Sequence, residues 1–204
     1  MDTLLLARHG FAVSNSDGGT ASCTPPGEGL TPEGVEQGRR LGEALADVHI
    51  DLGVSTELRR TQETLELALA GRAIPRIVVP ELNEIRFGRY DGGPLDDYRA
   101  WAWSEPPDVR APGNGDSRAD GAARYARGLR VLLDRPEPVV LAIGHALSIR
   151  YVVDAGQGLV PAARMAHVPH AQPFRFSAAE VERAASLLEA WSAAPRFRDP
   201  SKEG

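Results

Sequence analysis

Short apolar runs alternate with amphipathic stretches along this chain. Residues 3–7 (TLLLA) and 138–144 (PVVLAIG) are continuous apolar runs of the length expected for fully buried strands. DLGVS at 51–55 and RIVV at 76–79 predict two further short strands, and PFRF at 173–176 predicts another. We therefore expect a sheet whose central strands are covered on both faces.

The segments between these runs have the apolar spacing and the end signals of helices. Thr31 stands before Pro32 as an N-cap before a first helical position, and Ser177 with Glu180 has the pattern of a capping box. Helices are predicted in the segments 30–45, 56–70, 117–133, from about 147, and 177–191. Strands alternating with helices predict an α/β protein, a three-layer α/β/α sandwich with a mostly parallel central sheet.

Three stretches lack this periodicity. Residues 14–29 are dense in Gly, Ser, Thr and Pro and predict a loop. The irregular stretch of about 85–114 predicts a long, cap-like excursion, which in a compact domain is usually functional or mobile. The end of the chain, about 195–204, is expected to be loose. No linker divides the sequence, so we predict a single domain over residues 1–204.

Composition narrows the class of protein. The chain has 204 residues, 42% of them hydrophobic and 25% charged, which is ordinary for a globular protein. Cys23 is the only cysteine, so no intramolecular disulfide is expected. No apolar run approaches the roughly 20 residues that span a bilayer, and Asp2 stands where a signal peptide would be basic. We expect a cytoplasmic protein without a membrane partner. A net charge of −5 argues against nucleic-acid binding.

Two histidines each follow a predicted buried strand directly. His9 comes after residues 3–7 with Arg8 beside it, and His145 comes after residues 138–144. Either histidine alone is explained as a cap that hydrogen-bonds a strand carbonyl. If the two strands are parallel neighbours, however, both imidazoles emerge at the carboxyl edge of the sheet, where ligands bind in such folds. Together with Arg8, the pair indicates a functional site.

The chemistry of this trio favours a phosphoryl group over a metal ion. A guanidinium repels a cation, and no carboxylate is adjacent in the sequence. A neutral imidazole nitrogen can attack phosphorus, while arginine and a second, protonated histidine hold the phosphoryl oxygens. Such a site also needs an acid to protonate the leaving oxygen.

A series of motifs resembles the histidine phosphatase superfamily, with its phosphoglycerate-mutase-like fold, in that family's order. They are LLLARHGFAVSN (4–15), LTPEGVEQGRRLGEAL (30–45), VSTELRRTQETL (54–65), ELNEIRFGRYDG (81–92), GNGDSRADGAARYARGL (113–129) and VVLAIGHALSIR (139–150).

The resemblance implies a role for each matching residue. His9 would be the nucleophile that becomes phosphohistidine, and Glu84 would protonate the leaving group and then help to activate water. Arg8, Arg60 and His145 would hold the phosphoryl oxygens and take part in catalysis. The residues implied to bind the substrate are Arg8, Gly10, Asn15, Arg60, His145 and Ala146. The resemblance implies no metal and no cofactor, because the arginines and His145 would supply the positive charge.

The implied activity is that of a metal-independent phosphatase acting on a small-molecule phosphate ester. A phosphomutase and a non-catalytic phosphate-binding or regulatory protein are the alternatives. The family commonly has a polar pair where this chain has Phe11 and Ala12, and a glycine where it has Ala146. Both departures favour a more apolar or more crowded pocket. The sequence leaves the ester itself and the oligomeric state open.

Several other residues are candidates with ordinary structural explanations beside them. Arg86 and Arg89 either bind the rest of the substrate or are surface arginines. The HVPH stretch at 167–170 has no third metal ligand nearby, so His170 is expected at the rim of the pocket rather than on a metal. Three aromatic residues either form a cap over an organic substrate or pack in the core: Tyr98, Trp101 and Trp103.

Overall fold

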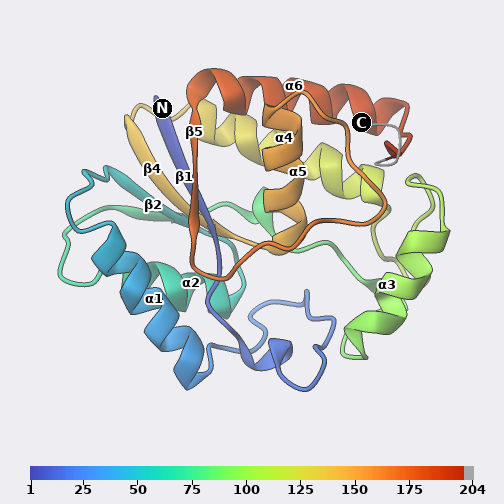
Figure 1. Ribbon diagram of the computed structural model, residues 1–204, viewed down its shortest axis with the longest axis horizontal. Helices are drawn as coiled ribbons and strands as arrows, with labels where there is room; N and C mark the ends of the chain where they lie inside the picture. The colour runs from blue at the N-terminus through green and yellow to red at the C-terminus, as the bar shows by residue number, and fades with distance from the viewer. Residues whose placement is uncertain (200–204) are drawn as a thin grey trace.

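A single five-stranded sheet organises the part of the chain that the structure, a computed structural model, describes, residues 1–199 (Figure 1). The strand order is β3-β2-β4-β1-β5, and only β5 runs antiparallel to its neighbour. The strands are β1 (Thr3–Arg8), β2 (Leu52–Ser55), β3 (Arg76–Val78), β4 (Val139–Gly144) and β5 (Pro173–Ser177). The prediction of a mostly parallel sheet is confirmed.

The helices cover both faces of the sheet, as predicted for three layers (Figure 1). They are α1 (Pro32–Ala44), α2 (Arg59–Ala68), α3 (Leu95–Ser104), α4 (Arg118–Leu133), α5 (Ala146–Gly156) and α6 (Ala178–Ala193). Alternate side chains of β1 enter different cores. Leu4 and Leu6 pack in the cluster shared with α4, α5 and α6, while Leu5 and Ala7 pack in the cluster shared with α1 and α2. Burial on both faces explains why β1 is continuously apolar.

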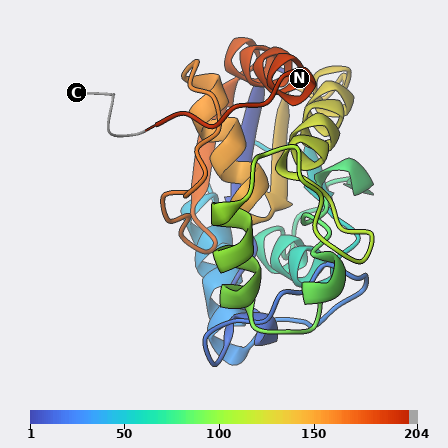
Figure 2. The same ribbon diagram turned by 90° about the vertical axis from the view of Figure 1, so that its right-hand side faces the viewer.

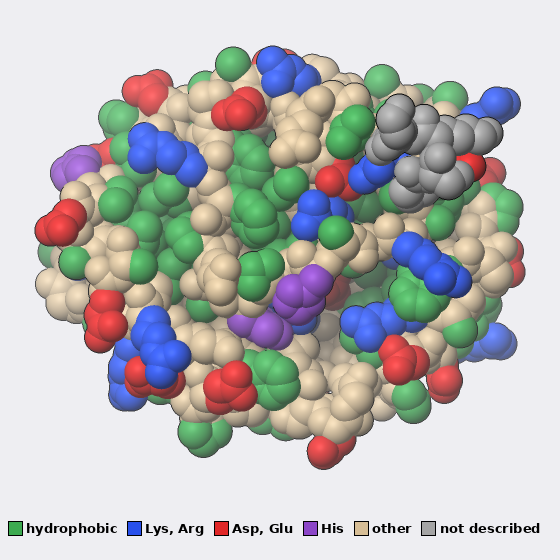
Figure 3. All heavy atoms as spheres, viewed as in Figure 1, with side chains coloured by type: hydrophobic (Ala, Val, Ile, Leu, Met, Phe, Trp, Pro, Cys, Tyr) green, Lys and Arg blue, Asp and Glu red, His purple; other side chains and the backbone are tan. Residues whose placement is uncertain are grey.

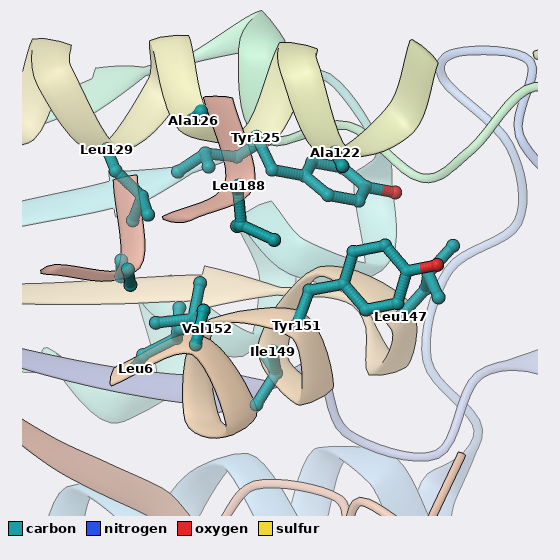
Figure 4. Packing of buried hydrophobic residues seen from close by; sticks show 14 of the residues in the cluster. Leu6, Ala122, Tyr125, Ala126, Leu129, Leu147, Ile149, Tyr151, Val152 and Leu188 are labelled. Atoms are coloured by element: carbon teal, nitrogen blue, oxygen red, sulfur yellow. The ribbon is translucent and has the colours of Figure 1, made fainter. Parts of the chain in front are cut away.

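The larger core lies where α4, α5 and α6 meet. Tyr125 of α4, Tyr151 of α5 and Leu188 of α6 are almost inaccessible to solvent and lie together in Figure 4. The two tyrosine rings meet edge to face with centroids 6.3 Å apart, and their hydroxyls point the same way, away from Leu129 (Figure 4). This core therefore fixes how α4 and α5 pack against each other.

The excursion over 85–114 is more regular than the sequence indicated. It contains the single 3-10 turn Gly88–Tyr90 and the ten-residue helix α3, which faces the viewer in Figure 2. Only Tyr98 and Ala102 of α3 are buried, and its N-cap, Pro94, makes no side-chain capping bond. A helix held by so narrow an apolar face and begun without a capping side chain leaves little trace in the sequence.

Part of the predicted loose tail is also ordered. Residues 195–199 return to the core, where the Trp191 indole donates a 2.7 Å hydrogen bond to the Arg196 carbonyl. The ring of Phe197 lies 5.8 Å from that of Trp191. The Arg198 amide also donates to the Pro161 carbonyl at 3.0 Å, and its guanidinium lies 3.2 Å from Asp154. These residues are therefore ordered where a loose tail was expected; residues 200–204 lie outside the described part.

None of the described helices combines the length and apolar character needed to cross a membrane.

Candidate active site

The two histidines meet at the carboxyl edge of the sheet. β1 and β4 are parallel neighbours in a register that pairs Arg8 with Gly144, and the His9 amide donates to the Gly144 carbonyl at 3.1 Å. His9 and His145 follow these paired residues directly, and their ring centroids are 5.4 Å apart. The structure thus brings together the pair that the strand ends predicted.

Hydrogen bonds fix the tautomer of His9. Its Nδ1 lies 2.7 Å from the Gly10 carbonyl, an acceptor, so Nδ1 carries the proton. Nε2 then has a free lone pair, which accepts a 3.2 Å hydrogen bond from Arg60 Nε. Burial, together with the charges of Arg60 and Arg8, lowers the pKa of His9 well below its ordinary value. At neutral pH the imidazole is therefore neutral, with Nε2 as its nucleophilic atom.

His170 contacts the backbone of His9. Its Nδ1 lies 2.8 Å from the His9 carbonyl, and its ring stands between the rings of His9 and Phe11. Burial and the charge of Arg8 lower the pKa of His170 to about 4. The described residues contain no group of three or more His, Cys, Asp or Glu that could hold a metal ion.

Two arginines extend buried, unmatched N–H groups into the site. Arg8 donates from Nη1 to the Val168 carbonyl at 2.9 Å, and Arg60 donates from Nη2 to the Ser22 carbonyl at 2.9 Å. Arg8 Nε and Arg60 Nη1 are buried and make no hydrogen bond within the described residues. Burial lowers the pKa of Arg8 to about 10, so the side chain still carries its charge at neutral pH. Such groups are suited to an oxyanion.

His145 lies deep in the site. It is fully buried, its Nε2 lies 3.1 Å from the Thr56 hydroxyl, and Arg60 Nη2 lies 3.4 Å from its Nδ1. Burial and then the charge of Arg60 lower its pKa well below the ordinary value. The sequence could not reveal this depth of burial or the neighbouring guanidinium, and the expected protonated histidine concerns the site with a phosphoryl group bound.

Glu84 faces His145 from the start of the excursion. Its side chain is 13% exposed, with Oε2 3.9 Å from His145 Nδ1. The Ile85 amide donates to Oε1 at 3.0 Å. Three of the predicted catalytic groups, His9, His145 and Glu84, therefore belong to one cluster with both arginines.

The segment carrying Glu84 is held by residues to which the sequence analysis gave no role. Arg124 donates to the carbonyls of Asn83 and Glu84 at 2.7 and 3.0 Å. Asp116 is buried, accepts from Arg124 at 3.3 Å and binds Arg86 through both its amide and its guanidinium. The family motif over 113–129 contains Asp116, so the sequence did give a signal for this residue. Nothing in the sequence distinguished Arg124 from the other arginines of α4.

The remaining residues predicted to bind the substrate are Gly10, Asn15 and Ala146. The Gly10 amide donates to the Thr64 hydroxyl at 2.9 Å, and a Cβ at Gly10 would lie 2.5 Å from the Gly34 carbonyl. Its need for glycine thus comes from the close approach of α1. Asn15 accepts a hydrogen bond from the Ala12 amide through Oδ1 and makes none to His9 within the described residues. Ala146 lies on a cavity wall as the first residue of α5.

A cavity of about 300 Å³ adjoins the cluster of histidines and arginines. Arg8 and Glu84 contribute to its lining, and Figure 3 shows the surface hollowed beside histidine side chains, with basic side chains across the hollow. Tyr98 and Trp103 line it, as expected for a cap. The other walls are mostly apolar: Ile85, Phe87, Leu95, Leu147, Met165 and Val168.

Two other candidates, Trp101 and Arg86, do not line this cavity. Trp101 is not among the lining residues; its ring stacks on that of Tyr90 at 5.7 Å, and Arg89 lies over the same Tyr90 ring. Arg86 is paired with Asp116 at 2.7 Å and lines a second cavity, of about 470 Å³, that also borders Glu84.

An α/β sandwich with two histidines at adjacent strand ends, beside two buried arginines, has the arrangement that a phosphoryl-binding site requires. The profile of the histidine phosphatase superfamily (branch 1) matches residues 4–194. The chain belongs to this superfamily, as its motifs indicated.

Relatives within the family carry two kinds of name. An adenosylcobalamin/α-ribazole phosphatase of Escherichia coli (strain K12) is 40% identical over 88 residues, 43% of this chain and 42% of that protein. A 2,3-bisphosphoglycerate-dependent phosphoglycerate mutase of Methylocella silvestris is 34% identical over 137 residues, 61% of this chain and 65% of that protein. These matches span well under the full length of the relatives.

Structural similarity extends further along the chain. The crystal structure of the α-ribazole phosphatase from Shigella flexneri superposes with a TM-score of 0.68 and 29% identity, covering 77% of this chain and 80% of that one.

Proposed function

We propose that this protein is a phosphatase that hydrolyses a phosphate monoester through a phosphohistidine on His9. One observation carries the proposal: the unprotonated Nε2 of His9 faces the Arg60 guanidinium, and both that guanidinium and the Arg8 guanidinium keep a buried N–H group that no acceptor of the described residues satisfies. A nucleophile and an oxyanion site in contact are what phosphoryl transfer requires. The likeness to proteins named as α-ribazole phosphatases supports hydrolysis over transfer back to the substrate.

In the first step His9 Nε2 attacks phosphorus and the bond from phosphorus to the ester oxygen breaks. Arg8 and Arg60 stabilise the charge on the equatorial oxygens, for which Arg60 would exchange its present bond to His9. Glu84, in its acid form, gives its proton to the departing oxygen, so an alcohol is released.

In the second step water replaces the alcohol. The Glu84 carboxylate takes a proton from the water, whose oxygen attacks phosphorus and displaces His9 Nε2. Inorganic phosphate leaves, and Glu84 is again protonated for the next cycle. A dianionic phosphoryl group beside His145 raises the pKa of that imidazole, so we infer that His145 gains a proton only with the phosphoryl group in place.

Phosphate release from an aryl phosphate tests the proposal. With EDTA present, the wild type should turn over, because the two arginines supply the positive charge that a metal would otherwise provide. The His9→Ala variant should lose the activity, and His49→Ala, remote on the surface, should keep it. Turnover that survives in His9→Ala would mean that His9 is not the nucleophile.

Two further readouts separate the alternatives. Acid-labile, alkali-stable phosphate on the wild-type protein, absent from His9→Ala, would distinguish an enzyme from a phosphate-binding protein. Release of free phosphate would distinguish the phosphatase from a mutase, which returns the group to its substrate. A cytoplasmic location and a small organic phosphate ester as substrate are part of the same proposal.

A further inference from the structure

Arg118 is a basic residue in a position that helix physics disfavours. It is the first residue of α4, whose N-cap Ser117 and capping-box partner Asp120 already satisfy the helix start. The positive end of the helix dipole repels a cation there. Arg118 is nevertheless only 7% exposed, so its charge is also removed from water. A role other than helix stability is needed to explain it.

No carboxylate neutralises this buried charge. Arg118 donates from Nε to the Tyr151 hydroxyl at 3.0 Å and from Nη2 to the Ala163 carbonyl at 3.1 Å, and within the described residues it forms no ion pair. Arg124 of the same helix, which is less deeply buried, has Asp116 at 3.3 Å. A buried cation without a counter-ion is costly, and an anionic ligand would offset that cost.

A buried hydroxyl lies beside this charge. The hydroxyl of Tyr98, on α3, is buried and makes no hydrogen bond of normal geometry within the described residues. Burial raises the pKa of Tyr98 and the charge of Arg118 opposes that rise, as expected for neighbours. The Tyr151 ring also contacts the guanidinium, with its centroid 5.8 Å from Arg118 Cζ.

Arg118 and Tyr98 both line the cavity that Arg8 and Glu84 also line. Apolar side chains, Phe87 and Met165 among them, line the same cavity. A molecule in this cavity would therefore meet Arg8 and Glu84, apolar surface and Arg118. The cavity is thus suited to an ester that carries a second anionic group besides its phosphate.

We propose that Arg118 and Tyr98 determine specificity by binding a second oxyanion, a carboxylate or a further phosphate, on the leaving group of the ester. The placement of the leaving group rests on the proposed phosphatase function. The binding of an oxyanion at Arg118 rests on the geometry of the cavity.

Calorimetric titration of the full chain with non-hydrolysable phosphonates tests this inference. The probes are alkylphosphonates of increasing chain length that end in a carboxylate, in a second phosphonate, or in a neutral carboxamide. At one or more lengths the carboxylate or the second phosphonate should bind roughly ten- to hundredfold more tightly than the carboxamide, the range for hydrogen bonds to a charged group. Which of the two binds better identifies the oxyanion. Equal affinities at every length would overturn the proposal.

Variants identify the residue responsible. In Arg118→Gln the charged and neutral probes should bind equally well. Arg99 is the matched control, because it lines the same cavity but is paired with Asp96 at 2.9 Å and 46% exposed; Arg99→Gln should keep the preference. Loss of the preference in Arg99→Gln alone would contradict the assignment. If Arg118→Gln does not fold, as judged by circular dichroism, the probe series on the wild type still tests whether the cavity binds a second oxyanion.

Binding and turnover can fail separately. A preference for the charged probes in a protein that hydrolyses no ester would leave the Arg118 site standing and remove the phosphatase function. Turnover of a simple aryl phosphate by a protein with no preference for the charged probes would leave the phosphatase function standing and remove the Arg118 site.

Discussion

The two ends of the candidate site are built in different ways. At the phosphoryl end, His9 and His145 follow two strands that are hydrogen-bonded neighbours, and their positions follow from the sheet itself. At the leaving-group end, Tyr98 comes from α3 and Arg118 from the first turn of α4, beside Tyr151 of α5. The residues proposed for phosphoryl transfer are thus placed by hydrogen-bonded strands. The residues proposed to select the substrate are placed by the packing of helices.

This contrast predicts that changes at the phosphoryl end reduce the rate for every ester, whereas changes at the other end alter which ester is preferred. The predictions below test it from the largest expected effect to the smallest.

Glu84→Gln should have the largest effect. Loss of the proton donor is expected to lower kcat for an alkyl phosphate by about 10²- to 10⁴-fold. An aryl phosphate, whose leaving oxygen needs less protonation, should lose much less. Steady-state rates for the two esters measure the difference, with Glu81→Gln as the control on the same segment. Equal losses for both esters would argue against Glu84 as the acid.

Arg60→Gln should lower kcat/KM for all esters by about 10²- to 10³-fold, because one donor to the transferring group is lost. Arg59 provides a matched control in the adjacent position. Its side chain is 62% exposed and paired with Glu63 at 2.6 Å, so Arg59→Gln should retain nearly full activity. The same assay on both variants would show whether Arg60 or Arg59 serves the site.

Stability should fall as the pH is lowered from about 6.5, because the unfolded chain then protonates histidines that the folded protein keeps neutral. The pKa is lowered to about 4 for His170 and well below its ordinary value for His9 and His145. More protons bind to the unfolded state across this window, so the free energy of unfolding decreases toward acid pH.

Urea unfolding between pH 7 and pH 4 measures this dependence. Removing the imidazole in His170→Asn should reduce the slope by about 1 kcal/mol per pH unit, less than the maximum of about 1.4 because His170 is partly exposed. The lost hydrogen bond to the His9 carbonyl is corrected for by the stability difference at pH 8. An unchanged slope would contradict the burial argument.

Trp103→Ala should have the smallest effect. The ring is 41% exposed, lines the cavity and lies 4.9 Å from Arg164 Cζ. Its loss should raise KM for a bulky ester by roughly fivefold, about 1 kcal/mol, while kcat for a small aryl phosphate stays near the wild-type value. A comparable loss of kcat for both esters would mean that the cap serves the chemistry rather than selection.

The elements recovered best from the sequence were those with the simplest environment. β1 and β4 are buried on both faces, so their residues are continuously apolar and unmistakable. The N-caps Thr31, Ser117 and Ser177 each accept a hydrogen bond from the helix they begin, as their residue types predicted.

The elements missed were those whose order depends on a few tertiary contacts. α3 is held mainly by Tyr98 and Ala102, and residues 195–199 by Phe197 and the Trp191 indole. In each case a short segment is ordered by a few aromatic contacts, such as Tyr98 on Phe87 and Phe197 on Trp191. These contacts do not follow the periodicity of a helix or a strand, so the pattern of apolar residues does not record them.

By itself, the sequence determined the strands, most of the helices and the presence of His9 and His145 at strand ends, because these follow from local periodicity; that the two strands are neighbours is shown by the structure. Only the tertiary structure decided the protonation of the histidines, the clamp of Arg124 on the Glu84 segment and the unpaired charge of Arg118. These properties depend on depth of burial and on neighbours distant in sequence. A residue's type states what it can do, and the packing around it determines its charge and its partners.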